Sequence, residues 1–130
     1  MAIGRRLAAR AGVQTRAVAR IEGYRFGSVL VDGSEESADV IVLPGRVVRN
    51  WVRRRGHALA IEDLAEVLDE LPERLVVGTG AVGRMRVDPA VLERLQERGV
   101  TLESMATAEA VRRYGELDGA TTAAALHLTC

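Results

Sequence analysis

The sequence lacks the features that mark secreted and membrane proteins. Its one cysteine, Cys130, stands at the last position, so no internal disulfide can form and nothing indicates an oxidising compartment. A prenylation signature needs its cysteine four residues from the end, so this position does not fit. No apolar run approaches the roughly 20 residues that a transmembrane helix requires. These absences favour a cytoplasmic protein.

Aromatic residues and lysine are scarce as well. Only four aromatic residues occur in 130, which leaves Val, Leu, Ile and Ala to form the core. All 18 basic residues are arginine, and 18 acidic residues balance them. Because the formal net charge is zero, bulk attraction of the whole chain to nucleic acid or to an anionic membrane is not expected.

Charge is nevertheless uneven at the start of the chain. Residues 1–20 contain no acid and carry five arginines: Arg5, Arg6, Arg10, Arg16 and Arg20. We expect an Arg-rich N-terminal extension over residues 1–20, followed by a single domain over residues 21–130. A poorly ordered extension, an organelle-targeting presequence and a short amphipathic helix are all compatible with this composition.

Beyond residue 20, short apolar runs alternate with helical patterns. We expect strands at 28–31, 40–43, 47–52, 75–77, 100–105 and 121–128. Helices are expected over 61–71, from Pro89 to a stop at Gly99, and from a cap at Thr107 to Leu117. This alternation predicts an α/β fold: a mixed, mostly parallel sheet with helices on its faces and a small extra β portion.

The segment LVVGTGAVG has the glycine spacing of a dinucleotide-binding turn, at Gly78, Gly80 and Gly83. Such a turn works because a helix follows it directly and presents its N-terminus to the pyrophosphate. Here residues 84–87 read as extended, and a helix begins only near Pro89. A dinucleotide site is therefore not expected, and no cofactor is predicted.

A glycine-rich turn at the end of a parallel strand can still hold a small ligand, because open α/β sheets bind ligands at that edge. Thr79 and Thr107 are the candidate polar contacts beside the glycines, and Arg84 or Arg86 could hold an anion. The alternative is that the glycines serve only the turn.

Candidates for catalysis are few, and Cys130, His127 and Thr107 are the ones to consider. A Cys–His pair could act as nucleophile and base, since a thiolate needs a base or a positive field to form near neutral pH. Along a strand, however, the side chains of His127 and Cys130 point to opposite faces, and nothing in the sequence brings His57 to either of them. Whether the protein is an enzyme stays open.

Metal-ligand spacing is absent. Two histidines 70 positions apart and one cysteine do not form a recognisable ligand set, so no metal site is predicted. The acidic residues between 62 and 73 are expected to form the solvated face of the helix over 61–71.

A second acid-free stretch surrounds Trp51 and contains five arginines: Arg46, Arg49, Arg53, Arg54 and Arg55. Arginine beside an exposed tryptophan is typical of protein–protein hot spots, and also of stacking platforms for nucleic acid. Because the net charge is zero and no nucleic-acid motif is present, a protein partner or a plain surface loop is favoured over nucleic acid. The predicted partner contacts are Trp51, Arg49, Arg53, Arg54 and Arg55.

Several segments, taken in order, resemble one family: YRFGSVLVDG, DVIVLPGRVVRNW, LVVGTG, the helix after Asp88-Pro89, GVTLESMATAEAVRRYGEL and the terminal HLTC. It is the small α/β domain family of the vertebrate adipogenesis-associated protein and a mitochondrial respiratory complex I assembly factor, with many prokaryotic members. The resemblance covers about residues 20–130 and implies a compact three-layer fold. Gly115 departs from the family, which usually has Asn there.

Two functions from different classes follow. The first is a small binding or assembly module that docks a protein partner through Trp51 and its arginine neighbours. The second is a small-molecule-binding protein or small enzyme of a bacterial pathway that uses the loop from Gly78 to Gly83. Substrate, partner identity and oligomeric state are not encoded in any motif, and an oligomer is possible.

Overall fold

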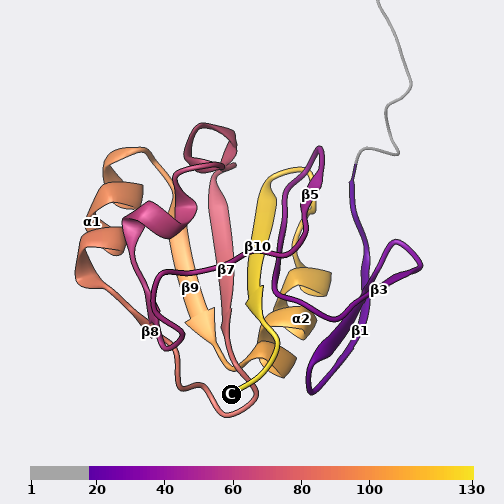
Figure 1. The fold of residues 1–130 in the computed structure, drawn as a ribbon. Coiled ribbons are helices and arrows are strands. Elements are labelled where there is room, and N and C mark those ends of the chain that lie inside the picture. Colours follow the sequence, from indigo (N-terminus) through magenta and orange to yellow (C-terminus); the bar gives the residue numbers. More distant parts are fainter. Residues whose placement is uncertain (1–17) are drawn as a thin grey trace, which may run out of the picture.

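The computed structural model describes residues 18–130, so the predicted N-terminal extension lies outside the described residues except for 18–20. The strands are β1 (Ile21–Arg25), β2 (Ser28–Val31), β3 (Ser34–Glu36), β4 (Val40–Val42), β5 (Val47–Val48), β6 (Ala58–Leu59), β7 (Arg74–Thr79), β8 (Arg86–Val87), β9 (Thr101–Met105) and β10 (Thr122–His127). The helices are the 3-10 helices η2 (Ile61–Leu64) and η3 (Leu68–Glu70) and the α-helices α1 (Pro89–Glu97) and α2 (Thr107–Glu116). Figure 1 shows their arrangement.

The central sheet has the strand order β5-β4-β10-β7-β9. β7 pairs in parallel with β9 and with β10, and helices α1 and α2 lie in the crossovers that connect these strands. β4 pairs antiparallel with both β10 and β5. Its pairing with β5 is a hairpin, because a short turn at Pro44-Gly45 joins the two strands without a helix. The predicted α/β class is therefore confirmed, but the sheet is mixed and not mostly parallel.

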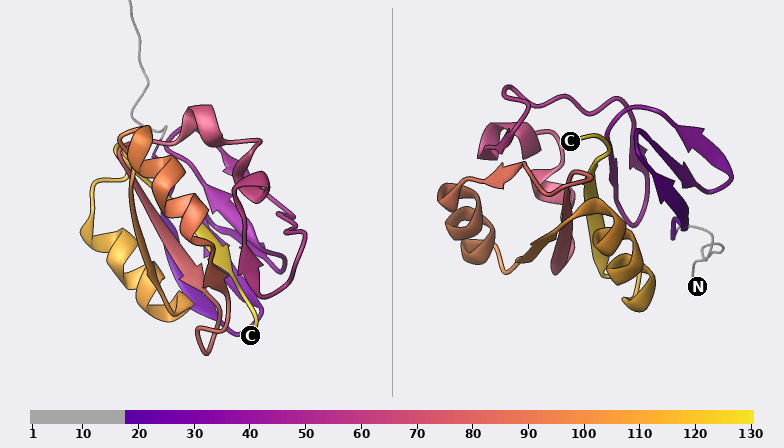
Figure 2. Two further views of the ribbon diagram at one scale, coloured as in Figure 1. Left: turned by 90° about the vertical axis from the view of Figure 1, so that its left-hand side faces the viewer. Right: turned by 90° about the horizontal axis from the view of Figure 1, so that it is seen from below.

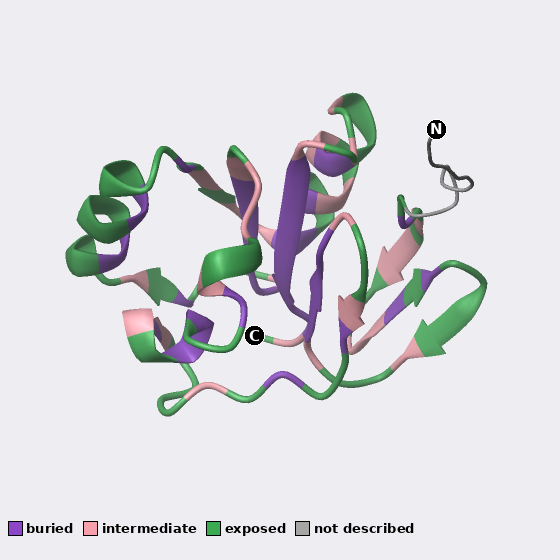
Figure 3. Ribbon diagram, turned by 90° about the horizontal axis from the view of Figure 1, so that it is seen from above, coloured by how far each residue is buried: buried purple, intermediate pink, exposed green. Residues whose placement is uncertain are grey.

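Both faces of the central sheet are buried, which makes the domain three-layered (Figure 2). Leu75 and Val77 of β7 join the core beneath α1 and η2, whereas Val76 between them joins the core beneath α2 and the β1–β2 hairpin. The residues of β10 alternate between the two cores in the same way. Figure 3 shows the continuous burial of these central strands. This explains why they read as uninterrupted apolar runs in the sequence.

The extra β portion is an antiparallel sheet of β1, β2 and β3. The Asp32-Gly33 turn takes positive φ at both positions, 51° and 79°, which suits the tight hairpin between β2 and β3. The sequence signal for this turn was correct. β3 itself was not predicted, because its residues, Ser34–Glu36, are polar and mostly exposed.

The helix expected over 61–71 is wrong, since two short 3-10 helices occupy the segment. The residues that turn inward are Leu64 and Val67, which with Ile61 recur every three positions. That spacing matches the three residues per turn of a 3-10 helix. Asp63, expected on a solvated face, is buried, and its carboxylate accepts hydrogen bonds from the backbone N–H groups of Ala60 and Arg54.

The two α-helices agree better with the sequence. α1 begins at Pro89 after the Asp88 cap, whose side chain accepts a hydrogen bond from the N–H of Ala90. Gly99 follows the helix with φ of 78°, as expected of a C-terminal stop. α2 begins at Thr107, but Thr107 is its first residue and not its cap. Its hydroxyl is engaged elsewhere, at the end of the sheet.

Candidate functional site

The carboxyl ends of the parallel strands β7, β9 and β10 meet at the lower edge of the sheet in Figure 1, where an open α/β sheet usually binds its ligand. The structure brings Gly80, Thr107 and His127 together at this edge. The Thr107 hydroxyl accepts a 2.9 Å hydrogen bond from the N–H of Gly80 and donates a 2.5 Å hydrogen bond to the carbonyl of His127. The Thr79 hydroxyl donates to the carbonyl of Met105.

These hydroxyl groups form hydrogen bonds within the chain, so they offer few free donors or acceptors to a ligand. Thr107 has no exposed surface and Thr79 is 7% exposed. Gly78 is needed for packing, because a Cβ there would lie 2.8 Å from the Thr107 hydroxyl oxygen. The predicted ligand contacts of Thr79 and Thr107 are thus replaced by contacts within the chain.

The space beside Gly80 is filled by the last residues of the chain. Gly80 has a φ of 108°, and a Cβ there would lie 2.5 Å from the carbonyl oxygen of Cys130. The N–H of Ala81 donates to the carbonyl of Thr129. From Gly83 the chain continues into β8, and the next helix along the chain begins only at Pro89. The first residue of α2, Thr107, does lie against the glycines, but its N–H donates to the carbonyl of Gly80 at 3.0 Å. The expectation that an extended segment, and not a helix, follows these glycines is confirmed.

A buried ionic cluster of Asp39, Arg53 and His127 lies at the same edge. One Asp39 oxygen, Oδ2, accepts a 2.7 Å hydrogen bond from Arg53 Nη1 and lies 2.9 Å from His127 Nδ1. The other accepts from the N–H of Leu128 at 2.8 Å. The side chains of Arg53 and His127 are 5% and 8% exposed.

Charge and burial oppose each other at Asp39. Burial raises the pKa of its carboxyl, but the hydrogen bonds from Leu128, Arg53 and His127 outweigh burial and hold the pKa below its ordinary value. The His127 Nε2 atom is buried without a hydrogen-bond partner among residues 18–130. The cluster therefore fixes the loop after β5 to the end of β10, and it presents no accessible base to a substrate.

Trp51, expected to be exposed, belongs to the core. It is 7% exposed, its Nε1–H donates to the carbonyl of Asp63, and its ring lies 5.0 Å from the Arg53 guanidinium carbon. Arg49 pairs with Glu36 at 2.7 Å. The prediction of an exposed Trp51 platform is wrong, and of the five predicted partner contacts only Arg54 and Arg55 are exposed without an ion pair within residues 18–130.

The remaining catalytic candidate, Cys130, lies beside His57 and not beside His127. Its Sγ is 3.9 Å from His57 Nε2, and both residues are exposed. No sequence pattern linked these two residues, which stand 73 positions apart.

Of the exposed arginines that form no ion pair within residues 18–130, four gather in two adjoining loops: Arg54, Arg55, Arg84 and Arg86. The loops are joined by a 2.9 Å hydrogen bond from the N–H of Arg86 to the carbonyl of His57 and by pairing of β6 with β8. Val52 and Val82 stand at the same loops and are 81% and 67% exposed. We call Val52, Arg54, Arg55, Val82, Arg84 and Arg86 the basic loop surface.

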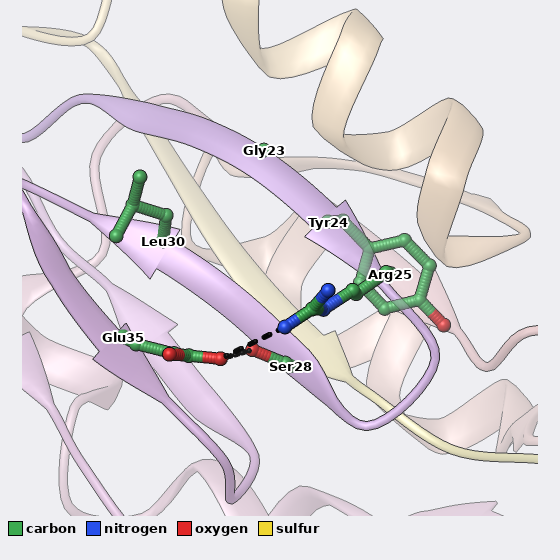
Figure 4. A pocket seen from close by; sticks show the side chains of 6 residues that line it. All are labelled: Gly23, Tyr24, Arg25, Ser28, Leu30 and Glu35. Atoms are coloured by element: carbon green, nitrogen blue, oxygen red, sulfur yellow. Dashed lines mark hydrogen bonds and ion pairs between the residues drawn. The ribbon is translucent and has the colours of Figure 1, made fainter.

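Two concave sites accompany these features. A pocket of about 330 Å³ lies on the β1–β3 sheet, where its lining includes Tyr24, Leu30 and the Arg25–Glu35 pair (Figure 4). A second pocket of about 350 Å³ lies beside the basic loop surface, between Arg54, Arg55 and the starts of η2 and α1. Neither pocket was predicted, because each is formed by short segments without a motif.

The described part of the chain, residues 18–130, also lacks two kinds of feature. No helix in it is long and apolar enough to cross a membrane. Its His, Cys, Asp and Glu side chains form no group of three or more that could hold a metal ion.

Comparison with known proteins identifies the fold and the family. A family model described as a protein of unknown function (DUF498/DUF598) matches residues 21–127. A conserved hypothetical protein from Pyrococcus horikoshii OT3 is 30% identical, with a TM-score of 0.72 over 85% of this chain and 99% of that chain. A protein from Bordetella parapertussis is 28% identical, with a TM-score of 0.69 over 88% and 99% of the two chains.

A Bordetella pertussis protein named as a Mth938-like domain is 23% identical, with a TM-score of 0.68 over 93% of this chain and 92% of that chain, which shows likeness of fold. The family match spans all of the described strands and helices. With its two cores, its mixed sheet and the closed glycine turn, this chain belongs to the DUF498/DUF598 family.

Proposed function

We propose that this chain is a binding module that docks an acidic segment of a protein partner on the basic loop surface. The observation that carries the proposal is the gathering of Arg54, Arg55, Arg84 and Arg86 without ion-pair partners within residues 18–130. Other exposed arginines of the described chain either pair, as Arg46 does with Glu70, or stand singly, as Arg94 and Arg112 do on the two α-helices. Unpaired guanidinium groups are free to form bidentate hydrogen bonds with carboxylates.

The basic loop surface also contains exposed apolar side chains, which protein interfaces combine with charged ones. Val52 and Val82 are among the most exposed large apolar residues of the described chain. Apolar contacts surrounded by arginine are typical of protein–protein recognition sites. A nucleic-acid partner is less well supported, because neither loop presents an exposed Phe, Tyr or Trp side chain for base stacking.

The loops are held in place before any partner arrives. Arg53 and Trp51 fix one loop through the Asp39 cluster and the bond to Asp63, while Met85, 2% exposed, anchors the other in the core. Such preorganisation lowers the entropy that binding would otherwise cost. The partner-docking role also agrees with the resemblance to the complex I assembly factor, and a cytoplasmic location is part of the same proposal.

The competing role, a small enzyme that uses the loop from Gly78 to Gly83, has less support. The hydroxyl groups of Thr79 and Thr107 bond within the chain, and residues 129–130 fill the space beside Gly80.

Site-specific photo-crosslinking in the native host tests the proposal. A photoreactive amino acid replaces Val52 or Val82, both of which are exposed enough to accept it. We expect a discrete crosslinked partner that is lost in the Arg55→Glu/Arg86→Glu variant. The matched control is Arg94→Glu/Arg112→Glu, which reverses two exposed, unpaired arginines on α1 and α2 and should keep the crosslink. Equal crosslinking in both double variants, or no discrete partner, overturns the proposal.

A further inference from the structure

The polar pocket beside the basic loop surface has an unusual charge arrangement. Two arginines, three acids and two alanines line its volume of about 350 Å³, a size that suits a small molecule. The charged residues are Arg54, Arg55, Glu62, Asp63 and Asp88. The pocket lies where the end of β6 meets the first residues of η2 and the cap of α1.

Opposite charges line this pocket without neutralising one another. Within residues 18–130, neither arginine approaches Glu62, Asp63 or Asp88 closely enough to form an ion pair. Asp63 is engaged by the backbone, since its two oxygens accept from Arg54 and Ala60 N–H groups. Arg54, Arg55 and Glu62 thus line the pocket without an ion-pair partner within residues 18–130.

The chemistry of a matching ligand follows from this separation. A purely anionic ligand would be attracted by the arginines but repelled by Glu62 and Asp88. A purely cationic ligand would be attracted by these acids but repelled by the arginines. A molecule with a carboxylate at one end and an ammonium group at the other satisfies both sides. The polar lining of the pocket and its lack of aromatic side chains favour a compact, hydrophilic molecule over a nucleoside or a lipid.

We propose that this pocket binds a small zwitterion of the amino-acid or dipeptide class. The carboxylate lies against Arg54 and Arg55, and the ammonium group lies against Glu62 and Asp88. The proposed small-molecule site is therefore this pocket and not the glycine turn, because residues 129–130 fill the space beside Gly80. It does not depend on partner docking, because Arg84 and Arg86 do not line it.

Three dipeptide probes of nearly equal shape test the charge pattern by titration of the ¹⁵N-labelled protein. L-alanyl-L-alanine carries both charges, its N-acetyl derivative lacks the ammonium group, and its C-terminal amide lacks the carboxylate. We expect the zwitterion to perturb amides of residues 54–62 and 88–90, and each blocked probe to bind about tenfold more weakly or worse, because it loses a charge-assisted hydrogen bond.

Two variants assign the charges. Glu62→Gln should weaken the zwitterion but leave the N-acetyl probe unchanged, and Arg55→Gln should weaken the zwitterion but leave the amide probe unchanged. Arg112→Gln on α2 is the control and should change nothing. Equal binding of all three probes, perturbations elsewhere, or no binding up to about 20 mM overturns the proposal. Arg84→Glu/Arg86→Glu should abolish partner crosslinking but keep dipeptide binding, so the two proposals fail separately.

Discussion

At the scale of single residues, Asp39 contributes most to holding the loop after β5 against the end of β10. Replacement by Asn would leave the Arg53 guanidinium buried without a counter-charge. We expect Asp39→Asn to lower the free energy of unfolding by about 3 kcal/mol, because breaking a buried pair costs far more than forming it gains. Urea denaturation measures the change.

The control for this prediction is an exposed pair of the same kind. Asp69 pairs with Arg98, and its side chain is 92% exposed. Asp69→Asn should cost less than about 1 kcal/mol. A loss of similar size in both variants would contradict the structural role assigned to Asp39.

The same carboxylate predicts a dependence of stability on pH. Since the folded-state pKa of Asp39 lies below its ordinary value of 3.8, its contribution is complete above that value and is lost as the pH falls through the folded pKa. The unfolding free energy of the wild type should therefore decline below about pH 4, and the difference from Asp39→Asn should shrink there. Denaturation series at neutral and acidic pH measure both. A difference that stays constant with pH would refute the assignment.

Two glycines give opposite predictions for the same substitution. Gly80→Ala should destabilise the fold by about 2 kcal/mol, because its φ of 108° is strained for alanine and the new Cβ would collide with the Cys130 carbonyl. Gly115 lies inside α2 with nothing within 4 Å of a new Cβ, so Gly115→Ala should stabilise by about 0.5–1 kcal/mol. Thermal unfolding distinguishes the two, and a loss at Gly115 would show that the family position has a packing role.

At the scale of elements, the sequence predicts the strands and helices whose buried residues recur at one regular spacing. The runs of β7 and β10 and the Asp88-Pro89 start of α1 were found because local chemistry alone determines them. The segment 61–71 was misjudged because leucines at helical spacing are also compatible with 3-10 turns, and only the core decides which residues turn inward. β3 carried no apolar signal at all.

The candidate site was less predictable for a related reason. Asp39 and His127 stand 88 positions apart, and no local pattern marks a loop aspartate as the partner of a strand histidine. Trp51 was expected outside because arginines surround it, yet its indole N–H finds a buried carbonyl at Asp63. Arg84 and Arg86 were recognised as possible anion contacts, but only the pairing of β6 with β8 places them beside Arg54 and Arg55.

At the scale of the whole molecule, zero net charge conceals a local positive field. Within residues 18–130 most other arginines pair with acids and a few, such as Arg94 and Arg112, stand singly, whereas the basic loop surface gathers four unpaired arginines. The Debye length is about 8 Å at physiological ionic strength, so an acidic chain lying on this surface would sense its arginines, together with Glu62 and Asp88 beside them, more strongly than charges elsewhere on the molecule.

Poly-L-glutamate is a probe for that field. We expect it to perturb the amides of residues 52–57 and 82–86 at low salt, and the perturbation to vanish at about 0.5 M NaCl, where the Debye length approaches 4 Å. Arg84→Glu/Arg86→Glu should remove the effect and Arg94→Glu/Arg112→Glu should retain it, although both variants change the net charge equally. If binding followed net charge alone, both variants would lose it to the same degree, and the surface would have no special role. Binding that persists at high salt would instead mean that Val52 and Val82, and not the arginines, provide the affinity.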